Sequence, residues 1–391
     1  MILLHCFILF SLIRIFYYLS IGLLYKNPAS KYSRYKPLVS VIIPAWNEEV
    51  GIQKTIRSVM NNGYSNFEIL VINDGSKDST VQKVQELKRR YWKNKRKIIL
   101  ISQTNTGKAL ALNNGISKAS GEIIITVDAD SYLTPGTIRK LISPLKDNQN
   151  DVAIGQIIVG NTKSLLGLIQ HFEYMFSFHN KRAQNLLNSI FIFPGALSAF
   201  RKKVLNEVGC YENYSCTEDL DLSMRIRSAG HKVVYIQDAI CITEGPSIIQ
   251  GLFNQRVRWR HGFLQCLLHR KDFLYKSEKG KYLSLIELPL SLLGTIEILL
   301  FPFFFVYLLF QVFTLTSPLL MFFSFLLLPY AFLLIKQDGL KLRPLEISLA
   351  LFIPFYFLLV NTVEYAALMK SLYRVCTKQN TAWTVWQRRG V

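Results

Sequence analysis

Four long apolar runs constrain the fold of this 391-residue chain more than any other feature of its sequence. They extend over residues 1–25, 283–310, 318–335 and 345–368. Each run has at least the roughly 18 residues with which a helix can cross the hydrocarbon core of a bilayer. The sequence therefore predicts a multi-pass membrane protein with one large polar domain between the first and second runs.

The formal charge of +20 has two explanations. Nucleic-acid binding would account for the charge but not for the apolar runs, so we expect no nucleic-acid partner. The basic segment 83–97 is explained more simply by solvation or by attraction to anionic lipid. Basic residues that follow the first run predict that the polar domain lies in the cytoplasm, beneath the cell membrane. These residues are Lys26, Lys31, Arg34 and Lys36.

The polar domain alternates between strand and helix patterns. Strands are predicted at 39–44, 68–73, 97–102 and 121–127, and helices at 50–62, 79–91 and 107–119. This alternation predicts an α/β fold with a mostly parallel sheet and helices on both faces. Ligands of such sheets collect at the carboxyl ends of the strands.

Acidic residues follow three of the predicted strands. Glu48 follows the first and Asp74 closes the second, while Asp128 and Asp130 close a later one with one alanine between them. Residues i and i+2 of an extended strand point to one face, so both carboxylates can reach one divalent cation that carries a diphosphate. An isolated Asp-x-Asp pair is more often a solvated turn. Acidic groups at three strand ends together favour a nucleotide site.

Six motifs occur in an order that resembles a known family. They are Ser40–Glu49, Asn73–Ser76, Gly107–Asn113, Asp128–Asp130, Thr217–Asp219 and Gln255–Trp259. This series, from about residue 39 to 260, resembles the processive, inverting family 2 glycosyltransferases, such as cellulose, chitin-oligosaccharide, hyaluronan and poly-N-acetylglucosamine synthases. The resemblance implies a GT-A-type α/β domain embedded in a helical transmembrane region with interfacial helices.

The resemblance also implies a donor site for a UDP-sugar. Contacts with the nucleotide are implied for Glu48, Asp74, Asp78, Lys108 and Asp128. Asp130, together with Asp128, is expected to hold Mg²⁺ or Mn²⁺. A metal and a cationic side chain would stabilise the negative charge that gathers on the leaving diphosphate.

Asp219 is the expected general base. Inversion by direct displacement requires one carboxylate to remove a proton from the acceptor hydroxyl, and the resemblance places Glu218 beside it in the acceptor region. Thr217 with the acidic residues after it also fits the N-terminus of a helix over 220–229, where negative charge is stabilising. Both interpretations can hold together.

The last of the six motifs, Gln255–Trp259, lies on a helix predicted over 247–268. By resemblance, Gln255 lies close to the donor, Arg258 near the diphosphate, and Trp259 stacks on the acceptor sugar. The alternative is an amphipathic interfacial helix rich in Arg and Trp, which would explain Arg256 and Arg260.

The C-terminal tail, residues 371–391, resembles a segment that closes over bound donor, with Trp383 and Arg388 as the candidate gate. Interfacial anchoring explains the same residues equally well. If all four apolar runs cross the membrane, the tail lies outside, so a gate requires one run to be re-entrant, interfacial or double. Glu287 and Glu297, inside the second run, would either line a glycan channel or pair with Arg14 of the first run.

Five segments are therefore expected: a transmembrane helix, a cytoplasmic glycosyltransferase domain, interfacial helices, a second transmembrane region and the tail. Their bounds are 1–25, 36–245, 246–282, 283–370 and 371–391. The predicted function is processive polymerisation of a β-linked glycan, with extrusion through the bilayer. UDP-N-acetylglucosamine is the leading candidate for the donor. A growing glycan and an accessory membrane subunit are the expected partners. The alternatives are transfer of one sugar to a lipid, and a catalytically silent scaffold.

Overall fold

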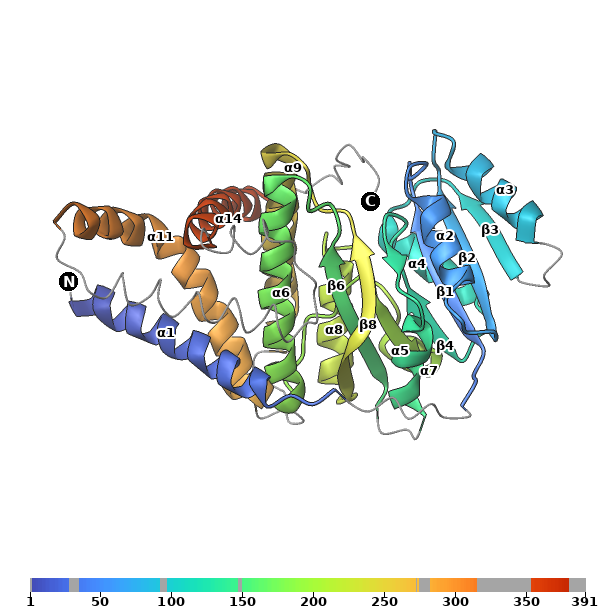
Figure 1. The fold of residues 1–391 in the computed structure, drawn as a ribbon, viewed down its shortest axis with the longest axis horizontal. Helices are drawn as coiled ribbons and strands as arrows, with labels where there is room; N and C mark the ends of the chain where they lie inside the picture. Colours follow the sequence, from blue (N-terminus) through green and yellow to red (C-terminus); the bar gives the residue numbers. More distant parts are fainter. Residues whose placement is uncertain are drawn as a thin grey trace.

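The computed structural model describes residues 2–27, 35–91, 97–146, 150–271, 273, 282–314 and 353–379. An eight-stranded sheet forms the centre of the polar domain, and long helices extend from one side of it (Figure 1). The strands are β1 (Val39–Ala45), β2 (Phe67–Asp74), β3 (Lys97–Gln103), β4 (Ile123–Thr126), β5 (Tyr132–Leu133), β6 (Val152–Val159), β7 (Ser198–Arg201) and β8 (Val233–Thr243).

The sheet has the strand order β3-β2-β1-β4-β7-β6-β8-β5. Strands β3, β2, β1 and β4 are parallel to one another, as predicted. Strand β7 pairs antiparallel with both β4 and β6, and β5 pairs antiparallel with β8. The sheet is therefore mixed rather than simply parallel. The four-residue strand β7 is inserted between β4 and β6, and so short a strand has too little sequence pattern to reveal its direction.

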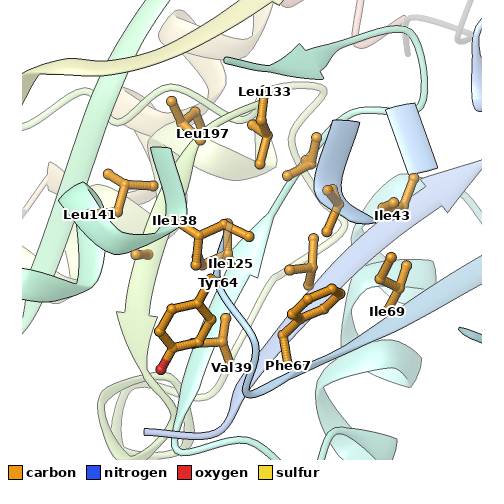
Figure 2. Close-up of a cluster of buried hydrophobic side chains, with 14 of the residues drawn as sticks. Val39, Ile43, Tyr64, Phe67, Ile69, Ile125, Leu133, Ile138, Leu141 and Leu197 are labelled. Atoms are coloured by element: carbon orange, nitrogen blue, oxygen red, sulfur yellow. The ribbon is translucent and has the colours of Figure 1, made fainter. Parts of the chain in front are cut away.

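Helices cover both faces of the sheet. On one face lie α2 (Ile52–Met60), α3 (Thr80–Tyr91) and α5 (Thr137–Ile142) with the short 3₁₀ helix η2 (Ser143–Leu145), and on the other α4 (Lys108–Lys118), α6 (Leu165–Leu186), α7 (Lys202–Val208) and α8 (Glu218–Ser228). Alternate residues of β1 point to opposite faces, so Val41 and Ile43 pack toward α2 and Ile42 toward α4. Figure 2 shows the first of these cores, where Ile138 of α5 lies among strand residues.

The remaining helices lie beside α6, away from β1–β4 (Figure 1). They are α1 (Ile2–Leu23), α9 (Ile249–His269), the π-helical turn η3 (Leu283–Glu287), α11 (Leu288–Thr314) and α14 (Ile353–Cys376). Among the residues that the structure describes, one helix, Leu283–Tyr307, is long and apolar enough to cross a membrane. The predicted span 318–335 and the candidate gate residues Trp383 and Arg388 lie outside the described residues, as does part of 345–368.

The acidic residues of the second apolar run have different partners. Glu297 forms an ion pair with Arg14 and accepts a hydrogen bond from Ser11 Oγ at 2.7 Å. Of the two predicted roles, pairing with the first helix is therefore confirmed for Glu297. Glu287 instead accepts hydrogen bonds from uncharged side chains, among them Tyr18 Oη at 2.9 Å. These contacts fasten α1 to the α11 segment.

Candidate active site

The carboxyl ends of β1, β2 and β4 surround a cavity of about 460 Å³, which we call the donor cavity. Five of the residues predicted for the donor site line it: Glu48, Asp74, Lys108, Asp128 and Asp130. Trp46, which lies in the first motif but was given no role, also lines it, as do Lys77 and Asn105, which lie outside the motifs. Glu48 and Asp130, which are 82 positions apart in sequence, therefore line one cavity because parallel strands end at one edge of a sheet.

Asp74 is held rigidly by the start of α4. Its Oδ1 accepts hydrogen bonds from the backbone N–H of Thr106 at 2.9 Å and from Gln103 Nε2 at 2.8 Å, and its Oδ2 accepts one from the backbone N–H of Gly107 at 2.9 Å. A carboxylate at a helix N-terminus is stabilised by the helix dipole. These contacts fix the loop that carries Lys108 against the end of β2.

Asp78 lies apart from the cavities described here. Its Oδ1 accepts a hydrogen bond from the backbone N–H of Thr80 at 3.0 Å, and its Oδ2 accepts one from that of Glu49 at 3.0 Å. It therefore caps α3 and ties it to the loop after β1. That loop presents the neighbouring Glu48, which is 7% exposed, to the donor cavity.

Asp128 and Asp130 follow β4 in a turn and not in the extended strand from which their shared face was inferred. Buried Ala129 separates them, and its carbonyl accepts a hydrogen bond from Thr55 Oγ1 at 2.8 Å. Both carboxylates still line the donor cavity. Within the described residues, no cluster of three or more His, Cys, Asp or Glu side chains could hold a metal alone. Two carboxylates suit a hard cation whose other ligands are phosphate oxygens and water.

A second cavity of about 550 Å³, the acceptor cavity, adjoins the first. It is lined by all the residues predicted for the base and the acceptor: Glu218, Asp219, Gln255, Arg258 and Trp259. Four residues line both cavities: Lys108, Asp128, Asp130 and Arg258. The predicted donor and acceptor halves of the site are therefore adjacent in the structure, and two cationic and two carboxylate side chains form the wall that they share.

Lys108 connects these halves directly. Its Nζ lies 2.6 Å from Asp128 Oδ1 and 3.4 Å from Glu218 Oε1. Burial alone would lower the pKa of Lys108, but the two carboxylates outweigh it and raise the pKa above its usual range. The ammonium therefore stays charged between the donor and acceptor cavities.

Asp219 has the protonation behaviour of a general base. Burial, followed by the charge of Glu218, raises its pKa to about 6, while Lys108 and Arg258 act in the opposite direction. Its Oδ1 accepts the backbone N–H of Leu220 at 2.9 Å. A Cβ added at Gly195 would lie 3.0 Å from its Oδ2, so this glycine leaves the second oxygen room. The carboxylate can accept a proton near neutral pH.

The predicted helix N-terminus at this motif is also present. Thr217 is the N-cap of α8, whose first turn contains Glu218 and Asp219. The Thr217 side chain makes no capping hydrogen bond, and its Oγ1 lies 3.1 Å from Ser215 Oγ. The acidic residues therefore serve the helix terminus and the cavity together.

Trp259 is supported by a buried charge cluster that the sequence motifs did not identify. The guanidinium of Arg256 lies 4.3 Å from the centroid of the Trp259 ring. Arg256 is 1% exposed and pairs with Glu173 of α6 at 2.6 Å and with Glu364 of α14 at 3.4 Å. The explanation of Arg256 as an interfacial residue is therefore wrong. A basic residue among apolar neighbours on one helix face could have indicated a buried ion pair. The sequence could not identify the partners of Arg256, which lie 83 and 108 positions away.

Comparison with known proteins finds one family profile and several relatives to which the chain is similar. The sequence profile of glycosyl transferase family 2 matches residues 40–209. The chain is 34% identical over 260 residues to a poly-β-1,6-N-acetyl-D-glucosamine synthase of Staphylococcus epidermidis, a match that covers 66% of this chain and 61% of the relative. It is 31% identical over 269 residues to the enzyme of that name from Staphylococcus aureus strain COL, covering 67% and 64%. The match thus spans less than two thirds of the length of these relatives.

One solved structure shares the fold over most of the chain. It is a mannosyltransferase from Pyrobaculum calidifontis in complex with GDP-mannose and Mn²⁺, with a TM-score of 0.66 and 20% identity. The alignment covers 93% of this chain and 95% of that one. The likeness confirms the predicted GT-A-type α/β fold.

Proposed function

Residues 40–209 form a glycosyl transferase family 2 domain, and on this premise we propose that the chain is a membrane-embedded, inverting transferase that polymerises a β-linked glycan from a UDP-sugar. UDP-N-acetylglucosamine is the proposed donor, since two relatives are named for a polymer of that sugar. The observation that carries the proposal is the wall shared by the two cavities. Donor and acceptor can meet there, beside Asp219.

The donor cavity supplies binding for the nucleotide. Glu48, in the loop after β1, and Asp74, at the end of β2, line the part of this cavity where the uridine is proposed to bind. Lys108 and Arg258 bring positive charge to the wall shared with the acceptor cavity, where charge develops on the leaving diphosphate. Asp128 and Asp130 would hold Mg²⁺ or Mn²⁺, which would neutralise the diphosphate.

Asp219 is the proposed base. Its carboxylate removes the proton from the acceptor hydroxyl while that oxygen attacks the anomeric carbon and the bond to the diphosphate breaks. The proton passes to Asp219 and the electron pair leaves with UDP. Because the hydroxyl attacks on the face opposite the diphosphate, the anomeric configuration inverts. Gly195 keeps Oδ2 accessible, and Trp259, stacked on Arg256, offers a ring face to the acceptor sugar.

Processive transfer is supported by the extent of the acceptor cavity. Besides the residues of α8 and α9, it is lined by Ser291 and Thr295 of α11 and by Glu364 of α14. It therefore reaches helices expected to lie in or at the membrane, along the path that an extruded polymer would take. The bilayer, the cytoplasmic placement of the catalytic domain, an accessory membrane subunit and the gate at Trp383 and Arg388 belong to this proposal.

A donor panel tests the substrate. Enzyme purified in detergent with Mg²⁺ or Mn²⁺ is given UDP-N-acetylglucosamine, UDP-glucose or UDP-glucuronate, and released UDP and product length are measured. We expect UDP-N-acetylglucosamine to be used fastest and to give a polymer. Faster use of another donor would change the sugar assigned, and a product of one sugar on lipid would establish the non-processive alternative.

Membrane topology is tested separately. A tag at residue 391 should be inaccessible in sealed spheroplasts if the tail lies inside and closes over donor. Labelling of the tag from outside would rule out the gate.

A further inference from the structure

Helix α6 presents a polar face to the acceptor cavity. Tyr174, Ser177, Lys181 and Gln184 line the cavity at spacings of three and four residues, which places them on one side of the helix. From Tyr174 to Gln184 this face extends about 15 Å, at about 1.5 Å per residue. A buried helix that packed only against protein would present apolar residues here. The face is therefore suited to a long polar ligand.

Lys181 is the most unusual residue of this face. It is 9% exposed, and its Nζ donates a hydrogen bond to the carbonyl of Ile192 at 2.8 Å. Burial lowers its pKa to about 8, although the charge of Glu287 acts against this shift. An ammonium has three N–H donors, so two remain for other oxygen atoms. Burying a cation costs free energy, which a ligand that accepts its hydrogen bonds would recover.

Gln184 complements Lys181 one turn further along α6. Its Nε2 donates to Glu287 Oε1 at 2.7 Å, which fixes the amide because a carboxylate only accepts. Its Oε1 is buried and accepts no hydrogen bond from the described residues. Gln255 of α9, which is 6% exposed and lines the same cavity, also has a buried Oε1 that accepts no hydrogen bond from the described residues. The N–H groups of Lys181 and the two amide oxygens of Gln184 and Gln255 could therefore hydrogen-bond to the hydroxyl and carbonyl groups of a sugar.

The chain places Lys181 at a short distance from the base. The segment from Ile192 to Gly195 borders the acceptor cavity; Ile192 contacts Lys181, and Gly195 lies against Asp219. Three residues span at most roughly 11 Å when fully extended. Lys181 and Asp219 are therefore close enough for one oligosaccharide in the acceptor cavity to contact both.

We propose that Lys181 and Gln184 form a second glycan-binding subsite, which holds the sugar that precedes the reacting end of the acceptor. Lys181 donates to a hydroxyl or acetamide carbonyl oxygen, and Gln184 Oε1 accepts from a hydroxyl. This inference rests on the proposed function, since it assigns part of the acceptor site of that reaction.

The test uses the full chain in detergent with UDP-N-acetylglucosamine as donor. Lys181→Met removes the donor group and keeps the length of the side chain, whereas Lys181→Arg keeps N–H donors. The exposed Lys203→Met on α7 is the matched control. Acceptors are N-acetylglucosamine itself and short β-linked oligomers of it. Transfer to each acceptor is measured beside release of UDP in the absence of acceptor.

We expect Lys181→Met to raise KM for the oligomers about tenfold, equivalent to about 1.4 kcal/mol. KM for the single sugar and UDP release without acceptor should stay unchanged, and Lys181→Arg should restore part of the loss. An unchanged KM for the oligomers would overturn the inference, as would an equal loss of all three activities in both variants. If the unmodified chain transfers no sugar to any acceptor, the proposed function itself fails.

Discussion

Lys108 Nζ lies 2.6 Å from Asp128 Oδ1, and this ion pair stands at the boundary between the donor and acceptor cavities. The same ammonium lies 3.4 Å from Glu218, the neighbour of the proposed base. One side chain therefore lines both cavities and lowers the pKa of Asp219.

Replacement of Lys108 by Met should weaken both functions. Loss of charge-assisted contacts of about 1.5–3 kcal/mol predicts a rise in donor KM of about tenfold to a hundredfold. Because Lys108 lowers the pKa of Asp219, the acidic limb of the rate profile should also move to higher pH. Steady-state kinetics against pH measure both effects. Lys118→Met, at the exposed end of the same helix, should change neither.

Gly195→Ala should slow transfer without weakening donor binding. The added Cβ would lie 3.0 Å from Asp219 Oδ2 and 3.5 Å from Lys108 Nζ, so the carboxylate must shift. A displaced base predicts a loss in kcat of about tenfold or more. Combined with Asp219→Asn, the glycine substitution should cause little further loss, because both act on one group. Additive losses in the double variant would show that Gly195 acts elsewhere.

The pH profile of kcat should have an acidic limb near pH 6. Asp219, with its pKa raised to about 6 by burial and by Glu218, can accept a proton only when ionised. The rate should therefore fall as pH decreases through 6. Residual activity of Asp219→Asn should lack this limb. A limb at the same pH in that variant would assign the titration to another group.

Arg256→Met should destabilise the protein more than Arg260→Met. Arg256 is enclosed between Glu173 and Glu364, and removing it takes the cation from the Glu173 carboxylate and leaves Glu364 with Arg260. Breaking a buried pair costs about 3–5 kcal/mol. Arg260, 23% exposed at its side chain, pairs with Glu364, which Arg256 can still hold. Thermal unfolding in detergent compares the variants, and equal losses would contradict this account of α9 and α14.

Local patterns predicted the first half of the fold closely. The helix predicted over 79–91 is observed as Thr80–Tyr91, and the strand over 68–73 as Phe67–Asp74. Buried apolar strands alternating with amphipathic helices carry this information within each element. The same patterns placed Glu48, Asp74 and Asp128 at one edge, because parallel strands end together.

The remainder depended on contacts distant in sequence. The direction of β7 is set by its neighbours β4 and β6, and the polar face of α6 is explained only by the cavity beside it. The charge cluster of Arg256 unites three helices. No local pattern of residues reports such a partner.

Asp219→Asn is the variant on which the central proposal depends, and it should fold well. A carboxylate with a pKa of about 6 in the folded chain and 3.8 otherwise opposes folding as pH rises from about 4 to 6. Above pH 6 the cost is constant at up to about 3 kcal/mol. The uncharged amide removes it, so at pH 7 the variant should unfold at a higher temperature than the unmodified protein.

Glycan formation by this variant is the most direct measurement. Purified Asp219→Asn and unmodified enzyme are given labelled UDP-N-acetylglucosamine and metal, and polymer formation is measured beside UDP binding. We predict unchanged UDP binding and a loss of polymer of about a hundredfold or more, the usual contribution of a general base. Equal polymer formation by the two proteins would contradict the account.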